Sequence, residues 1–202
     1  VAEMKKLLLV LNLWRTWMAY MLSLTSSSKE KIFRDLERFA YGDSRHDKLF
    51  FTFSEVILFD RCFRNVLEYR LKMDKNLKAL MLRILFPVKK DMEIGRCEIG
   101  AGLVCYHGHG ITINAYRIGE NLSVWQGVTI GKNPKSEKAP TIGNNVSIYT
   151  NAVVAGDITI GDNVKIAAGT VVLCDVPGDC VVFGNPCVIK RQGKTKQSDV
   201  KK

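Results

Sequence analysis

Residues 142–172 read IGNNVSIYTNAVVAGDITIGDNVKIAAGTVV. A branched aliphatic residue returns every six positions in this stretch, at Ile142, Ile148, Val154, Ile160, Ile166 and Val172. A period of six fits neither the α-helix, which turns every 3.6 residues, nor a strand, which alternates every two. It is typical of hexapeptide repeats, in which each hexad forms one flat side of a coil and the coils stack into a parallel β-helix. Gly, Asn and Asp suit the corners of such coils, where the backbone turns tightly.

The same period continues toward the N-terminus with two interruptions. Ile99, Cys105 and Ile111 are six residues apart, and Ile118, Val124 and Ile130 are again six apart but shifted by one residue. This shift predicts an irregular coil within residues 113–117. The segment KNPKSEKAPT at 132–141 matches none of the pattern and predicts a loop that leaves the coil. Long loops in compact domains are often functional.

Residues 4–24, MKKLLLVLNLWRTWMAYMLSL, predict a helix with an apolar surface. Lysines before a leucine run resemble a signal peptide, but no small-residue cleavage site follows. Asn12 and Arg15 interrupt the run, which argues against a helix that spans a membrane. Two interpretations stay open: a helix that packs on a partner subunit, or a helix that lies in a membrane interface with Lys and Trp as anchors.

Further helices are predicted over residues 29–39, 52–73 and 75–86, with a turn at Asp43-Ser44 and an end at Pro87. The chain therefore divides into a helical region over 1–91, a β-helix over 92–191 and a basic tail over 192–202 that is expected to be disordered. In class terms this is an α+β protein.

The net charge of +10 is unevenly distributed. Residues 1–91 carry 18 lysines and arginines against 11 acidic residues, whereas residues 92–189 carry six against eight. Separate basic segments argue against one continuous nucleic-acid surface, and favour an anionic ligand or a membrane face as partner. The six cysteines form no CxxC pair, so reduced cysteines in a cytoplasmic protein are expected.

Two of the three histidines interrupt the repeat. His107 and His109 lie in YHGHGI, whereas His46 lies in a polar stretch and is expected at the surface. A regular coil has no structural use for two imidazoles. They are either solvated corner residues or a catalytic feature, and a metal site lacks further evident ligands. Imidazole has a suitable pKa to act as a general base near neutral pH. Asp91 and Glu93 precede the first coil and are candidates to orient His107.

Five segments together resemble the hexapeptide-repeat acyltransferases, and among them the serine acetyltransferase group with its relatives from polysaccharide biosynthesis. They are GAGLVCYHGHGITI, LSVWQGVTIG, PTIGNNVSI, VKIAAGTVVLCDVPG and VVFGNPCVI. The resemblance covers residues 93–191, and FRNVLEYRL at 63–71 is similar to that group's N-terminal helices. It implies a left-handed parallel β-helix, an exception to the usual right-handed crossover. It also implies a homotrimer, or a dimer of trimers, with acetyl-CoA as co-substrate and no permanently bound cofactor.

The resemblance also implies roles for individual residues. His107 matches the family's catalytic histidine, and Gly131, Thr150 and Ala168 match positions that contact the CoA arm. Lys190 and Arg191 are either contacts of the CoA phosphates or part of a solvated tail.

The chain departs from the serine enzymes around the acceptor. Tyr106 replaces an aspartate before the catalytic histidine, and Lys138-Ala139 replaces an Arg-His pair. Glu93 is nearest to an earlier family aspartate but one residue out of register, and His109 is a candidate contact of the acceptor. The expected acceptor is L-serine, as in cysteine biosynthesis. The alternatives are a sugar hydroxyl in polysaccharide biosynthesis and a non-catalytic β-helix scaffold. The expected location is the cytoplasm, with the inner face of the membrane as a variant.

Overall fold

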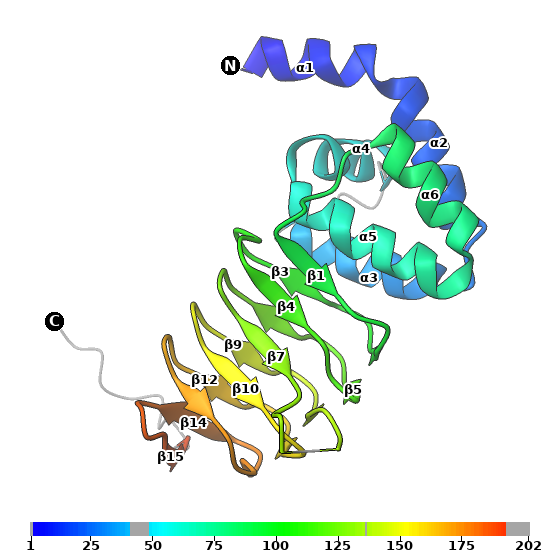
Figure 1. Cartoon of the computed structure of the whole chain (residues 1–202). Helices are drawn as coiled ribbons and strands as arrows, with labels where there is room; N and C mark the ends of the chain where they lie inside the picture. Colours follow the sequence, from blue (N-terminus) through cyan, green and yellow to red (C-terminus); the bar gives the residue numbers. More distant parts are fainter. Residues whose placement is uncertain (1, 41–48, 136, 193–202) are drawn as a thin grey trace, which may run out of the picture.

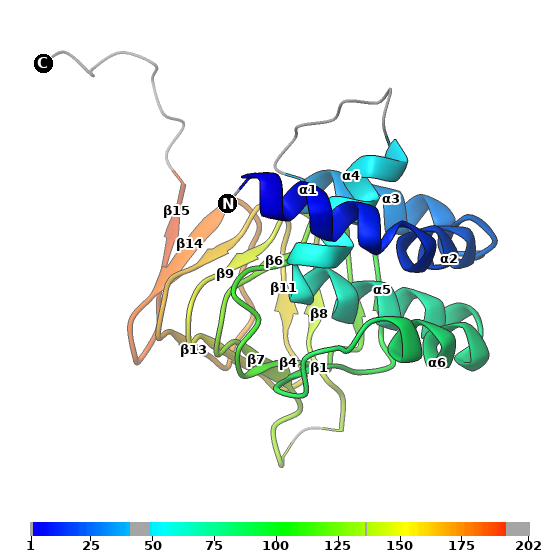
Figure 2. The ribbon, with the colours of Figure 1, turned by 90° about the horizontal axis from the view of Figure 1, so that it is seen from above.

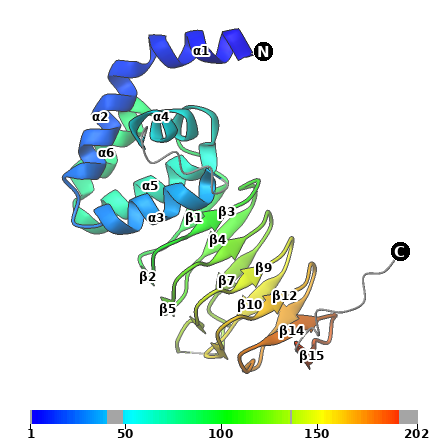
Figure 3. The same cartoon turned by 180° about the vertical axis from the view of Figure 1, so that it is seen from behind.

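The computed structural model describes residues 2–40, 49–135 and 137–192 (Figure 1). The predicted turn at Asp43-Ser44, His46 and most of the basic tail lie outside these residues. Helices lie at one end of a parallel β-helix, and the last strand lies at the other end (Figure 3).

Six helices precede the β-helix within the described residues. They are α1 (Ala2–Leu11), α2 (Leu13–Leu24), α3 (Lys29–Phe39), α4 (Leu49–Phe59), α5 (Arg61–Asp74) and α6 (Asn76–Leu85). The predictions for 29–39 and for the last helix are confirmed, the latter within one residue at each end. The predictions of single helices over 4–24 and 52–73 were wrong, because each of these segments is broken into two helices.

Each break has a local cause. The side chain of Asn12 donates to the carbonyl oxygen of Leu8 and accepts from Arg15, and α1 and α2 meet there at 65°. Oδ1 of Asp60 accepts the backbone N–H groups of Cys62 and Phe63 at 2.8 and 3.1 Å, so Asp60 caps the start of α5. Apolar residues keep helical spacing across both breaks, and for this reason the pattern did not reveal them.

Each of the first four coils of the β-helix contributes one strand to each of three sheets, and the last coil adds strands only to the first and third (Figure 2). The first sheet orders β1 (Met92–Ile94), β4 (Ile111–Ile113), β7 (Thr129–Gly131), β10 (Val153–Ala155) and β13 (Val171–Val172). The second orders β2 (Glu98–Ile99), β5 (Arg117–Ile118), β8 (Thr141–Ile142) and β11 (Thr159–Ile160). The third orders β3 (Val104–Cys105), β6 (Ser123–Val124), β9 (Ser147–Ile148), β12 (Lys165–Ile166), β14 (Cys180–Phe183) and β15 (Val188–Arg191). All pairs are parallel except β14 with β15.

The register places like residues above one another in a buried interior. In the second sheet the inward column is Ile99, Ile118, Ile142 and Ile160, all buried. In the first sheet, however, Ile130 pairs with Ile113, which lies eight residues after Cys105. The predicted phase through Ile111 was therefore wrong, although Ile111 is buried too. The HGHG turn adds two residues and the next corner is one residue short, which together give the net shift of one.

Asparagines line the corner between the second and third sheets. Asn121, Asn145, Asn163 and Asp179 have φ angles of 59°, 56°, 59° and 59°, in the left-handed region. Each asparagine amide donates to the next side-chain oxygen, at 2.9, 3.1 and 2.9 Å. These side-chain hydrogen bonds stabilise a backbone conformation that most residues avoid.

The substitution Asn145→Ala is expected to destabilise the protein by about 1–2 kcal/mol, because alanine pays the steric cost of a left-handed backbone. Asn145→Gly is the matched variant, since glycine also loses the side-chain hydrogen bonds but adopts this φ freely. Urea unfolding of the three proteins measures both effects. Equal losses for alanine and glycine would show that the backbone conformation is not the cause.

A buried ion pair joins the helices to the first coil. Nε of Arg70 on α5 lies 2.8 Å from Oδ2 of Asp35 on α3, and both side chains are buried. Arg70 also donates to the carbonyl oxygens of Ile99 and Gly100, at 2.7 and 2.6 Å. Oδ1 of Asp35 accepts two backbone N–H groups of the same coil, at 2.8 and 2.7 Å. The pair therefore fixes how the helices sit on the β-helix.

Candidate functional site

The HGHG turn projects from a regular corner between the third and first sheets. The N–H of Tyr106 donates to the carbonyl oxygen of Val124 at 2.8 Å, as a regular coil residue does. The regular pattern resumes at His109, whose carbonyl oxygen accepts the N–H of Gly127 at 2.7 Å. The residues between them, His107 and Gly108, are the two extra ones. Both have positive φ angles, 63° and 52°, so the backbone loops outward here.

The start of α5 supports this loop. A Cβ atom at Gly108 would collide with the Cys62 sulfur, so the close approach of helix and loop requires a glycine. Cys62 itself is held by the Asp60 cap. The helical region therefore determines the shape of the turn that carries His107.

A cavity of about 340 Å³ lies beside His107. Its walls come from the α4–α5 junction, Lys89 and the third strand, and include Phe39, Phe59, Asp60, Arg61, Cys62, Cys105 and Tyr106. His107 is exposed, and its imidazole has no hydrogen-bond partner among the described residues. It is therefore available to a bound molecule.

The carboxylate near the turn binds the other histidine. Nδ1 of His109 lies 2.9 Å from Oδ2 of Asp91, and the amino group of Lys89 lies 3.4 Å from the same nitrogen. The hydrogen bond from His109 holds the pKa of Asp91 below its usual value. The expectation that Asp91 orients His107 was therefore wrong. Glu93 lies within β1 in register with Thr112 and, among the described residues, makes no hydrogen bond or ion pair with either histidine.

Thr150 and Ala168 lie on the same edge of the β-helix as the two histidines. Equivalent backbone bonds mark their positions: Asn151 N–H to Gln126 at 3.0 Å, and Gly169 N–H to Thr150 at 2.8 Å. His109, Gln126, Thr150 and Ala168 thus form one column along this edge. The sequence did not single out Gln126, whose buried Oε1 has no hydrogen-bond partner among the described residues. A bound molecule with a donor group would satisfy it.

Three aromatic rings stack beside this column. The rings of Tyr106 and Trp125 lie 4.5 Å apart, and those of Trp125 and Tyr149 also lie 4.5 Å apart. Each ring directly follows an inward residue of the third sheet, so the three aromatic residues recur at one position of the repeat. The stack orders one wall of the edge and places a ring where the resemblance expects a carboxylate.

The other predicted site residues lie elsewhere in the chain. Gly131 ends β7, and Lys138 lies in the loop that follows it, so both occupy the edge between the first and second sheets. Ala139 is buried. Lys190 and Arg191 belong to β15, where the amino group of Lys190 lies 5.4 Å from the ring of Phe183. One chain therefore does not bring Lys138 and His107 to the same edge.

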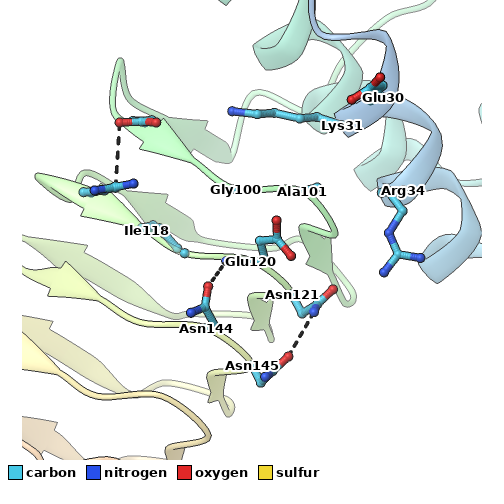
Figure 4. Close-up of a pocket in the computed structure, with 13 residues that line it drawn as sticks. Glu30, Lys31, Arg34, Gly100, Ala101, Ile118, Glu120, Asn121, Asn144 and Asn145 are labelled. Atoms are coloured by element: carbon cyan, nitrogen blue, oxygen red, sulfur yellow. Dashed lines mark hydrogen bonds and ion pairs between the residues drawn. The ribbon is translucent and has the colours of Figure 1, made fainter.

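A larger cavity of about 840 Å³ lies at the third edge, between α3 and the second and third sheets (Figure 4). Its walls include Glu30, Lys31, Arg34, Glu98, Arg117 and Glu120, in which basic and acidic groups balance. It holds no histidine or cysteine. Among residues 2–40, 49–135 and 137–192, no group of three His, Cys, Asp or Glu side chains is placed to hold a metal ion. The edge that carries His107 is therefore the better candidate for chemistry.

Burial raises the pKa of the Cys62 thiol to about 11, with the Asp60 charge adding to the effect. Thiolate at pH 8 is therefore about a hundredfold scarcer than for an ordinary thiol. We expect iodoacetamide at pH 8 to modify the exposed Cys174 and leave Cys62 intact in the folded protein, as read by peptide mass spectrometry. Fast modification of Cys62 would contradict this and would make Cys62 a candidate nucleophile. Unfolded protein, in which both thiols react, is the control.

The chain matches known proteins in sequence and in structure. A family model described as "Bacterial transferase hexapeptide (six repeats)" matches residues 139–174. The serine acetyltransferase of Synechococcus elongatus is 46% identical over 100 residues, which is 48% of this chain and 41% of that protein. WcaB of Escherichia coli K12, provisionally named a colanic acid biosynthesis acetyltransferase, is 36% identical over 122 residues, 57% of this chain and 75% of WcaB.

Solved structures agree with these matches. The serine acetyltransferase from Brucella abortus superposes with a TM-score of 0.67 at 26% identity, over 87% of this chain and 73% of that one. A serine acetyltransferase solved as a complex with CoA superposes with a TM-score of 0.63 at 26% identity, over 81% and 70%. The expected fold, N-terminal helices followed by a left-handed parallel β-helix, is confirmed.

The chain spans less than half the length of the Synechococcus serine acetyltransferase, but three quarters of WcaB. The repeat match and the extent of the WcaB match show that the chain is related to the hexapeptide-repeat transferases. The HGHG turn and the hexads indicate the same family. The chain therefore belongs to the bacterial hexapeptide-repeat transferases, and within them it is similar to the serine acetyltransferases and to WcaB.

Proposed function

We propose that the protein is an O-acetyltransferase that moves an acetyl group from acetyl-CoA to a hydroxyl acceptor. The observation that carries this proposal is the two-residue insertion that lifts His107 out of the coil beside a cavity. A coil gains nothing in packing from such an insertion, whereas a general base must be exposed to its substrate.

In the proposed reaction, His107 takes the proton of the acceptor hydroxyl as its oxygen attacks the thioester carbon. The acetyl C–S bond then breaks, and protonated His107 returns the proton to the CoA thiolate. Backbone N–H groups at the edge would stabilise the oxyanion. Because both substrates lie in one cleft, the step is effectively unimolecular. No acyl-cysteine is needed, and burial disfavours the thiolates of Cys62 and Cys105.

The column of His109, Gln126, Thr150 and Ala168 is the proposed track for the donor. His109 and Ala168 are exposed, and the buried, unsatisfied Oε1 of Gln126 lacks a donor that an amide or hydroxyl of the CoA arm would supply. The CoA complex of a structural neighbour supports the identity of the donor. Lys190 and Arg191 lie in the last strand and are proposed to meet its phosphates.

We propose a homotrimer, in which a second copy completes the site. The histidines lie on one edge of the prism, whereas Gly131 and Lys138 lie on another. A neighbouring subunit that presents its Lys138 loop to the His107 edge would bring the two halves together. Threefold association provides one such pairing for each chain.

The names of the relatives favour L-serine as acceptor. Two observations favour a sugar hydroxyl instead. The Tyr106 ring stacks on Trp125, and Ala139 is buried, where the resemblance leads us to expect polar groups in the serine enzymes. The extent of the WcaB match supports this second candidate.

A panel of acceptors with acetyl-CoA tests both candidates, with thiol release as the readout and mass spectrometry of the product. L-serine is compared with L-alanine, which lacks the hydroxyl, and with monosaccharides and nucleotide sugars. Turnover with L-serine supports the first candidate, and turnover with sugars alone supports the second. Absence of thiol release with every acceptor would overturn the proposal in favour of a non-catalytic scaffold.

A further inference from the structure

The helical region carries an exposed apolar surface that has no role in the site. Exposed apolar side chains follow helical spacing along α1 and α2, and a second stripe follows α6. We name this the outer apolar face; it consists of Met4, Leu7, Leu11, Trp14 and Met18 with Leu77, Leu80 and Ile84. Leu7 is 59% exposed, Trp14 62% and Ile84 77%, values far above those of core residues. Large contiguous apolar surfaces mark interaction sites.

The two stripes adjoin one another. α2 packs beside α6, and both point their buried residues, among them Ala19 and Leu82, toward the other helices. α2 and α6 lie on the side of the helical region away from the β-helix (Figures 1 and 3), and the residues of their stripes are exposed. α1 contacts α2 and α4 and extends beyond them, so most of its surface is uncovered.

These three helices carry more basic than acidic residues, although Lys6, Lys78 and Arg83 pair with Glu3, Asp74 and Glu68. α1, α2 and α6 together contain Lys5, Lys6, Arg15, Lys78 and Arg83, but only one acidic residue, Glu3. Apolar residues with Trp and Lys at their margin are the composition of helices that lie in a bilayer interface. Basic side chains also gain energy from anionic headgroups.

The geometry favours a helix lying on the membrane over a helix crossing it. Within the described residues no single helix is both long and apolar enough to span a bilayer; only the bent pair α1–α2 reaches that length and composition. Thr16, Ala19 and Ser23 of α2 are buried against the other helices, so α2 is part of the folded body. Extracting it into lipid would expose that core.

We propose that the outer apolar face binds the surface of an anionic lipid bilayer, with α1 and Trp14 in the interface. A second copy of the chain is the competing occupant of this face. With the two acidic partners from α5 counted, five basic groups stand against three acids, so two copies would bring net positive charge together, whereas anionic headgroups complement that charge. The proposal does not depend on the proposed acetyl transfer.

Flotation of the full chain with vesicles tests the proposal. Vesicles of phosphatidylcholine with phosphatidylglycerol are compared with phosphatidylcholine alone, each at low and high salt. We expect binding to be at least about tenfold stronger with phosphatidylglycerol, and to weaken with salt. Quenching of tryptophan fluorescence by brominated lipid gives an independent readout, because Trp14 and Trp17 are two of the three tryptophans.

The double variant Leu7→Glu/Leu11→Glu should lower binding at least about tenfold, and so should Leu80→Glu/Ile84→Glu, which guards against a folding defect in the first. Leu173→Glu is the matched control, since Leu173 is 56% exposed but lies far along the β-helix, and it should bind as the parent does. Circular dichroism verifies folding. The proposal is overturned if the parent protein does not float with anionic vesicles, or if Leu173→Glu binds as weakly as the other variants. It is equally overturned if sedimentation shows a mass that Leu7→Glu/Leu11→Glu halves while lipid binding is absent.

Discussion

Replacement of His107 by asparagine is expected to lower the rate of thiol release from acetyl-CoA by about 10²- to 10⁴-fold, the usual contribution of a general base. Asparagine removes the base but tolerates the left-handed backbone at this position, where φ is 63°. His107→Ala should lose a similar factor in rate and some stability as well, because the Cβ atom of alanine is strained in a left-handed backbone. Steady-state kinetics with saturating acceptor measure the loss.

His109→Asn is the matched control, since it makes the same exchange in the same turn. Its imidazole is bound to Asp91 and Lys89, so we expect a raised KM for the acceptor with a much smaller change in kcat. Calorimetric titration with CoA should give parental affinity for His107→Asn. Near-parental turnover of His107→Asn would remove His107 from the mechanism, whatever the effect of His109→Asn.

Removal of one partner of the buried ion pair should have the largest effect on stability. Asp35→Ala or Arg70→Ala is expected to destabilise the protein by about 3–5 kcal/mol, because an uncompensated charge stays buried together with backbone groups that lose their partner. This is a large share of the 5–15 kcal/mol that is typical of a folded domain. Urea unfolding, followed by circular dichroism, measures the change.

Arg34→Ala is the matched control for the buried pair. Arg34 also pairs with a carboxylate, Glu37, at 2.6 Å, but these side chains are 56% and 37% exposed to solvent. Its loss should cost less than about 1 kcal/mol. If Arg34→Ala and Arg70→Ala are equally destabilising, burial is not what makes the Arg70 pair important. Because the pair fixes the helices against the first coil, the Arg70 variant should also disturb the cavity beside His107.

The sequence predicted those parts of the protein that repeat or that break a repeat. Stacked aliphatic residues need a fixed spacing, so the hexads from Ile142 to Val172 revealed the fold. His107 stood out because the coil around it is regular. The phase through the HGHG turn was misjudged at Ile111, since Ile111 and Ile113 are both apolar and both buried. Only the pairing with Ile130 distinguishes them.

The repeat pattern did not predict contacts between distant parts of the chain. Asp35 and Arg70 are ordinary charged residues of two helices, and nothing in their local sequence indicates that they meet on the first coil. The same holds for Cys62, which supports Gly108 across the helical junction. The resemblance assigned Lys138 and His107 to one site. A comparison of sequences does not reveal that the two residues lie on different edges of the β-helix. The aromatic stack could have been predicted from the sequence, because each ring follows an inward position of the third sheet.

The column on the His107 edge has a further property that follows from its regularity. Neighbouring strands in a sheet are spaced by about 4.8 Å, so His109, Gln126, Thr150 and Ala168 mark equal steps along the edge. Each coil therefore adds one fixed increment to the length of this edge. The distance from His107 to the basic pair at the end of the β-helix depends on the number of coils between them. In such a fold, insertion or loss of a whole coil would change the length of ligand that fits while leaving the cross-section of the core the same.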